Sequence, residues 1–339
     1  MTAPLHCSEV TPAEEEQLFE LYRRFLSQPD RTIQLYQWRK QEGSSSAGIQ
    51  PFAAWLEAAM VGAVSAVPAV ITSNENYYRA VWQQDSIVDP AARGMGIASK
   101  LVEKARCDSD LLLAKGTSDA MYHLRLKSGF IDVPNSEYLT CVIARNYQTN
   151  GMRRWLYFRL LYVWFSLRRR RVRSTTLRCT QIARFSQDFD VLDRTLARGP
   201  CLRQAKNSEF LNWRYGSCPG REYHIVRADS DGVLRGAAVL NLEDSAGDAW
   251  LVDMLCDPGD SETISVLVDH GIRVSAAHGK ACLRTFCTSQ RIRSHLFAFG
   301  FVKSRSTPRF TCRVERKPGI APESVEWNIW HGDGDRELY

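Results

Sequence analysis

The sequence predicts an α/β protein built from two copies of one unit, each with a mixed sheet and helices packed against it. Strand-like and helix-like segments alternate along the chain, and four pairs of segments recur in the same order at a nearly constant spacing. The length of 339 residues suits about two domains, each large enough for its own core. Hydrophobic residues are 44% and charged residues 24% of the chain, which excludes a disordered, collagen-like or coiled-coil protein.

The repeat is visible as four matched pairs of segments. Strand–turn–helix segments start at Cys7 and at Cys179, and the next three pairs are Trp38-Arg39 with Trp213-Arg214, Val88-Asp89-Pro90 with Cys256-Asp257-Pro258, and 126–130 with 297–301. The spacings are 172, 175, 168 and 171 residues. Four matches in one order indicate an internal repeat. We therefore expect a first unit over 1–146, a connector over 147–176, a second unit over 177–316 and a tail over 317–339.

The ten cysteines point to buried thiols rather than to covalent or metal cross-links. None of them forms a CxxC pair, and no histidine lies at zinc-ligand spacing from them. This pattern predicts a reducing compartment and no metal site. The N-terminus is polar and then acidic, unlike a secretory signal. No apolar run reaches the ~20 residues that span a bilayer.

One turn between a strand and a helix carries the clearest functional signal. The strand-like segment 80–88 ends at Asp89-Pro90, because proline cannot continue a β-ladder. It is followed by Arg93-Gly94-Met95-Gly96-Ile97-Ala98, which begins a helix. Such a turn leaves backbone N–H groups free for an anion, and its glycines let the anion come close. The chain has no GxxxxGK(S/T) and no GxGxxG followed by an acidic residue ~20 positions on, which argues against P-loop and Rossmann sites.

The segment from Val88 to Ala98 resembles the acyl-CoA-binding motif of the GNAT acetyltransferase superfamily. That motif reads R/Q-x-x-G-x-G/A after a strand ending in V-x-P, and Lys127-Ser128-Gly129-Phe130 resembles the family's helix that ends in GF. The resemblance implies an acyl-CoA site in the first unit, formed by Ile87, Val88, Arg93, Gly94, Met95, Gly96, Ile97 and Ala98. The second unit carries Asp260 and Glu262 where a phosphate would lie, so we expect one working site.

The resemblance also indicates which residues would carry acyl transfer. Family members polarise the thioester carbonyl with a backbone N–H, which maps here near Ile87 or Val88. Asp85, just before the turn, is the candidate base, and a solvated carboxylate at a strand edge is the alternative. Arg125 occupies the family's usual tyrosine position. Either Arg125 or Tyr122 is therefore the candidate partner of the leaving thiolate, unless Tyr122 only packs the helix.

The two Trp-Arg pairs allow a functional and a structural interpretation. An aromatic–arginine wall would suit a sugar or peptide substrate. Trp213-Arg214 repeats the pair in the copy that lacks the acyl-CoA motif. This recurrence favours a repeated anchoring contact of a helix.

The connector is strongly basic and aromatic. From Arg153 to Arg184 there are ten arginines and no acidic residue. The net charge of the whole chain is only +6, so the rest of the chain has a net charge of about −4. General nucleic-acid binding is therefore not implied. Residues 155–167 are apolar except for Arg159 and Ser166. This pattern is typical of a helix that lies in the headgroup region of a membrane, here through Arg153–Arg173. A helix buried between the two units is the alternative.

The resemblance implies an acyl-CoA-dependent N-acyltransferase that transfers groups other than aminoacyl groups, with acetyl-CoA or another acyl-CoA as co-substrate. The chain resembles bacterial two-unit GNAT proteins of polysaccharide pathways, which implies the amine of an amino-sugar or sugar-lipid precursor as acceptor. Two alternatives stay open: a tRNA-dependent aminoacyl transferase, and a non-catalytic CoA-binding sensor or scaffold. The expected location is the cytoplasm, at the inner membrane face if the connector binds lipid.

Overall fold

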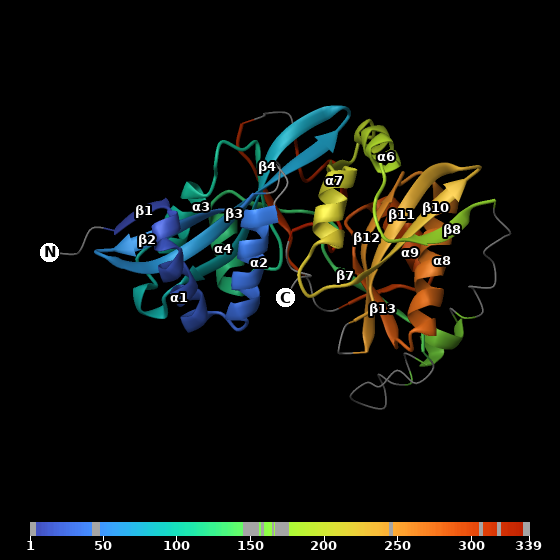
Figure 1. Ribbon diagram of the computed structural model, residues 1–339, viewed down its shortest axis with the longest axis horizontal. Coiled ribbons are helices and arrows are strands. Elements are labelled where there is room, and N and C mark those ends of the chain that lie inside the picture. Colours follow the sequence, from blue (N-terminus) through green and yellow to red (C-terminus); the bar gives the residue numbers. More distant parts are fainter. Residues whose placement is uncertain are drawn as a thin grey trace.

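A computed structural model shows two mixed sheets with helices packed on them, placed side by side along the long axis of the molecule (Figure 1). It describes residues 5–42, 48–144, 156, 159–164, 166, 176–243, 247–304, 308–316 and 320–334.

The elements follow the order that the repeat predicts. The first copy supplies β1 (Leu5–Glu9), η1 (Pro12–Glu14), α1 (Glu15–Phe25), α2 (Pro29–Glu42), β2 (Gln50–Leu56), β3 (Ala59–Ser73), β4 (Asn76–Val88), η2 (Pro90–Ala92), α3 (Ile97–Lys104), β5 (Leu111–Ala114), α4 (Asp119–Lys127), β6 (Ile131–Asp132) and β7 (Tyr138–Val142). The rest of the chain supplies β8 (Arg178–Ile182), α6 (Asp188–Ala197), β9 (Leu202–Gln204), α7 (Ser208–Leu211), the π-helical turn η3 (Asn212–Gly216), β10 (Tyr223–Ser230), β11 (Val233–Asn241), β12 (Asp248–Cys256), α8 (Ser261–Ala277), β13 (Cys282–Phe286), α9 (Gln290–Ala298), β14 (Val302–Lys303), β15 (Thr311–Val314) and β16 (Trp327–Asn328).

The two sheets have equivalent strand orders. The first runs β1-β2-β3-β4-β5-β15-β6 and the second runs β8-β10-β11-β12-β13-β7-β14, with β9 and β16 as additions to the first. In each sheet the fourth and fifth strands are parallel, β4 with β5 and β12 with β13. This equivalence confirms the predicted fold class of two copies of one α/β unit.

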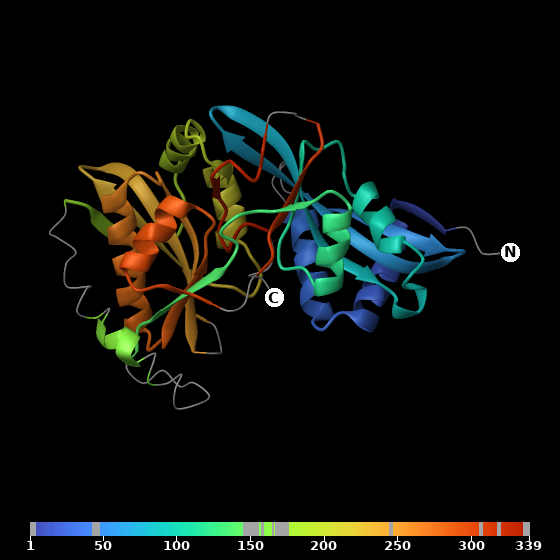
Figure 2. The same ribbon diagram turned by 180° about the vertical axis from the view of Figure 1, so that it is seen from behind.

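The two units exchange one strand each. β7 pairs with β13 in the second sheet, with Val142 opposite Cys282, and β15 pairs with β5 in the first sheet, with Thr311 opposite Ala114. Seen from behind, the green strand β7 lies in the second unit, while red segments from the chain's end run along the first (Figure 2). Neither 1–146 nor 177–316 therefore holds every strand of its own sheet.

Helices cover both faces of the first sheet and fix the position of the glycine turn. On one face α1 and α2 bury a cluster that includes Leu18 and Tyr36, and on the other α3 buries Ile97, Leu101 and Val102. The α3 helix lies so close to β3 that a Cβ atom at Gly62 would meet Ile97 Cγ2 at 3.0 Å. Burial of this apolar face holds the first turn of α3 against the sheet.

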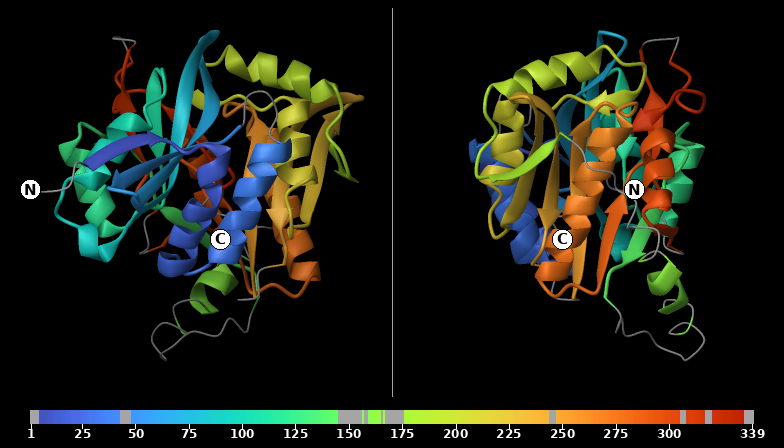
Figure 3. Two further views of the ribbon diagram at one scale, coloured as in Figure 1. Left: turned by 60° about the vertical axis from the view of Figure 1, so that its left-hand side comes forward. Right: turned by 90° about the vertical axis from the view of Figure 1, so that its right-hand side faces the viewer.

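The Trp-Arg pairs meet across the boundary between the units. Trp38 of α2 stacks on Trp213 of η3, with ring centroids 4.5 Å apart and planes 8° from parallel. Figure 3 shows α2 next to the second unit. Arg214 donates to the carbonyl oxygen of Gly332 at 3.1 Å. The stacked tryptophans therefore anchor one unit to the other, while Arg214 holds the C-terminal tail.

The C-terminal tail fills the second unit where its two parallel strands separate. The pairing of β12 with β13 ends at Leu251. Just beyond it, the Gly332 N–H donates to the Val252 carbonyl at 2.8 Å, and Trp330, which is 1% exposed, forms a β-bridge with Cys287. The tail thus occupies the place that a ligand would need.

A buried charge cluster fixes the tail there. The Lys206 ammonium lies 2.7 Å from an Asp253 carboxylate oxygen and 2.8 Å from Asp333, and Tyr215 donates to Asp253 at 2.7 Å. The two carboxylates raise the pKa of Lys206, although burial opposes them. The ammonium therefore stays charged and balances part of their charge.

All ten cysteines are free, and seven of them are buried. Within the described ranges, no helix is long and apolar enough to cross a membrane. The same part of the chain contains no group of three or more His, Cys, Asp or Glu side chains placed to hold a metal ion.

Candidate active site

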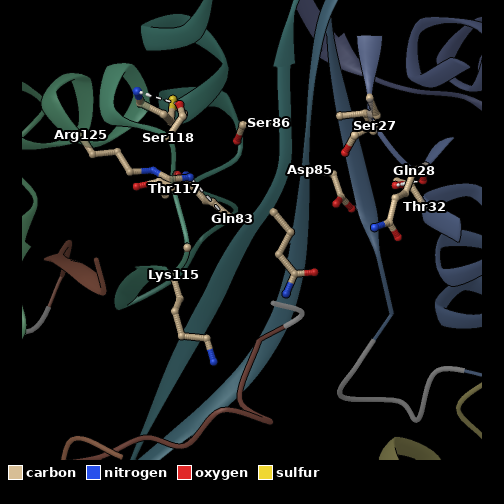
Figure 4. Close-up of a pocket in the computed structure, with 14 residues that line it drawn as sticks. Ser27, Gln28, Thr32, Gln83, Asp85, Ser86, Lys115, Thr117, Ser118 and Arg125 are labelled. Atoms are coloured by element: carbon tan, nitrogen blue, oxygen red, sulfur yellow. Dashed lines mark hydrogen bonds between the residues drawn. The ribbon is translucent and has the colours of Figure 1, made fainter. Parts of the chain in front are cut away.

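The strands β4 and β5 separate soon after they pair. Their ladder covers only Ala80 to Trp82 on β4, and past it a cavity of about 310 Å³ lies in the gap between the strands (Figure 4). It is lined by Leu26, Ser27, Gln28, Thr32, Gln83, Gln84, Asp85, Ser86, Lys115, Gly116, Thr117, Ser118, Met121 and Arg125. The wall therefore comes from β4, the loop after β5, α4, and the turn from α1 into α2.

A bulge in β4 aims Asp85 into this cavity. Ser65 of β3 pairs with Gln84 and Ala63 pairs with Ile87, so two residues of β4, Asp85 and Ser86, lie opposite the single residue Val64 of β3. Asp85 has a φ of 50°, in the left-handed region that aspartate tolerates better than most residues. A bulge of this kind redirects a side chain and ends regular pairing.

The Asp85 carboxylate is buried and paired. Its side chain is 6% exposed and lies 3.6 Å from the guanidinium of Arg39, which is 3% exposed. Burial together with the Asp85 charge raises the pKa of the Tyr22 phenol. The alternative interpretation of Asp85 as a solvated carboxylate at a strand edge is therefore wrong.

Arg125 and Tyr122 lie on different sides of α4. Arg125 is 1% exposed, lines the cavity, and donates from Nη2 to the Gln83 carbonyl at 3.4 Å. Tyr122 is absent from the cavity wall. Its hydroxyl donates to Asp132 at 2.6 Å, a bond that raises the pKa of the phenol, and Arg309 covers its ring at 4.6 Å. The structure brings Asp85 and Arg125 to one cavity and leaves Tyr122 outside it.

Lys115, at the end of β5, is a cavity residue that the sequence did not single out. Its ammonium donates to the carbonyl oxygens of Trp330 at 3.0 Å and His331 at 2.8 Å, and also to that of Asp333. It therefore links the cavity wall to the tail. A lone lysine after a strand gives no signal of such a role.

The glycine turn before α3 is exposed and has left-handed backbone at both glycines. Gly94 and Gly96 have φ values of 85° and 74°, and the residues from Arg93 to Gly96 are exposed. Gly96 is the N-cap of α3 and offers no side chain to its amides. The Ile87 side chain is buried in the core cluster that α1 and α2 cover. A phosphate group fits this turn because the first amides of the helix are open to it.

The equivalent helix of the second unit is capped by its own carboxylate. Asp260 accepts from the N–H of Thr263 at 3.0 Å and pairs with Arg235 at 2.7 Å. The hydrogen bonds from Arg235 and Thr263 lower the pKa of Asp260. A negative charge therefore already occupies the anion position of this unit.

Comparison with solved structures identifies the fold. A GCN5-related N-acetyltransferase from Anabaena variabilis superimposes with a TM-score of 0.62 at 10% identity over 92% of this chain and 73% of its own. A GCN5-related N-acetyltransferase from Kribbella flavida superimposes with a TM-score of 0.62 at 13% identity, over 92% of this chain and 71% of its own. N-myristoyltransferase of Saccharomyces cerevisiae, solved with myristoyl-CoA, gives a TM-score of 0.55 at 12% identity over 96% and 83%. No protein-family model and no curated protein matches the sequence. The chain has the GNAT fold.

Proposed function

We propose that this protein is an acyl-CoA-dependent N-acyltransferase with one active site, in the first unit. The observation that carries the proposal is the separation of β4 from β5, with the open glycine turn between η2 and α3 a few residues after β4. The pantetheine arm of an acyl-CoA would enter between the strands while its pyrophosphate rests on the turn. The fold shared with N-acetyltransferases supports this assignment.

The proposed reaction moves an acyl group from sulfur to nitrogen. The amine nitrogen attacks the thioester carbonyl, the C–N bond forms and the C–S bond breaks. Asp85 accepts the proton that the amine loses. The guanidinium of Arg125 lies across the cavity from Asp85 (Figure 4) and stabilises the negative charge of the departing thiolate.

The lining of the cavity favours a short acyl group and a hydrophilic acceptor. Leu26 and Met121 are the only apolar side chains among the 14 lining residues. A long acyl chain would bury its methylene groups against amides, hydroxyls and charges, which lose water without gaining partners. Acetyl-CoA is therefore the proposed co-substrate, and a polar amine such as that of an amino-sugar is the proposed acceptor.

Calorimetric titration with acetyl-CoA tests the binding step. The wild type should bind, and Gly96→Glu should lose most of the affinity because a carboxylate would face the pyrophosphate. Gly232→Glu is the matched control: its φ is 80°, and, as at Gly96, nothing lies within 4 Å of an added Cβ. Absence of binding by the wild type would overturn the proposal.

Thiol release tests the chemical step. Wild-type protein with acetyl-CoA is assayed over a panel of amino-sugars and other polar amines, and turnover with at least one acceptor is expected. Binding of acetyl-CoA without release of thiol for any amine would contradict an enzyme and favour a CoA sensor.

A further inference from the structure

The connector carries a short helix that protrudes from the second unit. Residues 159–164, with 156 and 166, are helical, and this green segment lies toward the lower edge of the molecule (Figures 1 and 3). The arginine run 168–171 and Arg153-Arg154 lie outside the described residues and enter here only as charges of the sequence.

Apolar side chains on this helix are exposed on one face. Leu156, Leu160, Val163 and Trp164 are 53%, 62%, 55% and 49% exposed. At 100° a residue they fall within one stripe about 100° wide. They are four of the nine large apolar side chains that are exposed in the described part of the chain, and the other five are scattered over separate elements. A helix buried between the two units does not fit these exposures.

The charge of the surrounding sequence indicates what kind of partner this apolar face binds. Ten arginines and no acidic residue lie between Arg153 and Arg184. A second copy of the chain would carry the same excess of positive charge in its connector, and repulsion between the two connectors opposes self-association. Nucleic acid would satisfy the arginines but not the apolar stripe. An anionic bilayer surface satisfies both, because its headgroups are negative and its acyl boundary takes up leucine, valine and tryptophan.

The length of the apolar segment sets the binding mode. The apolar run over 155–167 is 13 residues long in the sequence, whereas a helix needs about 20 apolar residues to cross a bilayer. The segment therefore lies along the surface instead of crossing it. We propose that the connector is an amphipathic anchor that binds the protein to membranes rich in anionic phospholipid, independently of the proposed catalysis.

Flotation of the full-length protein with vesicles tests this proposal. Wild-type protein should float with vesicles of phosphatidylcholine and phosphatidylglycerol at 7:3, and at least tenfold less should float with phosphatidylcholine alone. Replacing Arg168–Arg171 by serine should reduce flotation severalfold, and 0.5 M salt should have a similar effect, because salt screens exposed charges. Failure of the wild type to float with the anionic vesicles would overturn the proposal.

Paired variants separate the apolar face from general hydrophobicity. Leu160→Asp with Trp164→Asp should abolish flotation, whereas Val191→Asp with Val233→Asp, two positions 57% and 62% exposed elsewhere, should leave it unchanged. Equal flotation of both double variants would contradict the assignment of this face. Sedimentation without vesicles adds a second criterion: a dimer that only the first double variant dissociates would assign the face to a second copy instead.

Discussion

Asp85 combines a left-handed backbone, a buried side chain and a position on the cavity wall. Its place before the glycine turn made it a candidate from the sequence. Its partner was not predictable, because Arg39 lies 46 positions earlier and belonged to a repeated Trp-Arg pair. The second copy keeps the pair for a different contact, the backbone carbonyl of Gly332. The repeat therefore predicted the anchoring role of the Trp-Arg pairs. It gave no sign that Arg39 of the first pair also forms an ion pair with the candidate base Asp85.

Replacing Asp85 by asparagine should abolish most turnover and leave acetyl-CoA binding intact. Removing a general base typically costs 10²–10⁴-fold, so we expect a fall in kcat on the order of 100-fold or more. The measurement is thiol release under saturating acetyl-CoA, with calorimetric binding in parallel.

Asp231→Asn is the matched control for the backbone, because Asp231 has the same φ of 50° in a turn of the second unit. Loss of activity in both variants would assign the effect to folding. Unchanged kcat in Asp85→Asn would remove the carboxylate from the mechanism.

At the scale of elements, the strand and helix order and the glycine turn were predictable because they rest on local patterns. The exchange of β7 and β15 was not. β7 and β15 show the same alternation of apolar and polar residues, and each stands near the end of its copy. The local sequence pattern therefore fits either sheet equally well. The position of the C-terminal tail in the second unit was likewise not predictable, since only the fold brings Trp330 beside β12 and β13.

The packing of α8 on β10 makes stability depend on pH. His224 lies with ring centroids 6.3 Å from both His270 and His278. Burial lowers the pKa of His224 and of His270. The charges of His278 and Arg273 act in the same direction, and Asp269 opposes the shift at His270. The unfolded chain then binds more protons than the folded one as the pH falls below about 6.5, so the native state loses stability there.

Replacing His224 and His270 together by glutamine should therefore reduce the fall in Tm between pH 7.5 and pH 5.5. Thermal unfolding followed by circular dichroism at both pH values measures this difference. His123→Gln, at an exposed position of α4, should keep the wild-type difference. Parallel pH curves for the wild type and the double variant would show that these rings do not couple folding to protons.

At the scale of the molecule, the two units complete one another. Each sheet takes its sixth strand from the other copy, Trp38 stacks on Trp213 across the boundary, and Lys115 of the first unit binds the tail that fills the second. The internal repeat predicted two units of one fold. It did not predict that β5 and β13 would each become an unpaired edge strand if the other unit were absent. The pairing of an edge strand depends on contacts between residues far apart in the sequence.

Separating the chain within the connector should give fragments that fold only together. Co-expressed fragments 1–158 and 159–339, with a tag on the first, should co-purify and unfold in a single transition, because β7 and β15 cross between them. The first fragment alone should be insoluble, since β5 and β6 would lack β15. Cys312→Asp in β15, at a position 0% exposed and paired with Leu113, should abolish capture of the second fragment, whereas Val233→Asp should not. Two fragments that each stay soluble and unfold cooperatively alone would show that the exchanged strands are dispensable, and the two units would then be independent domains.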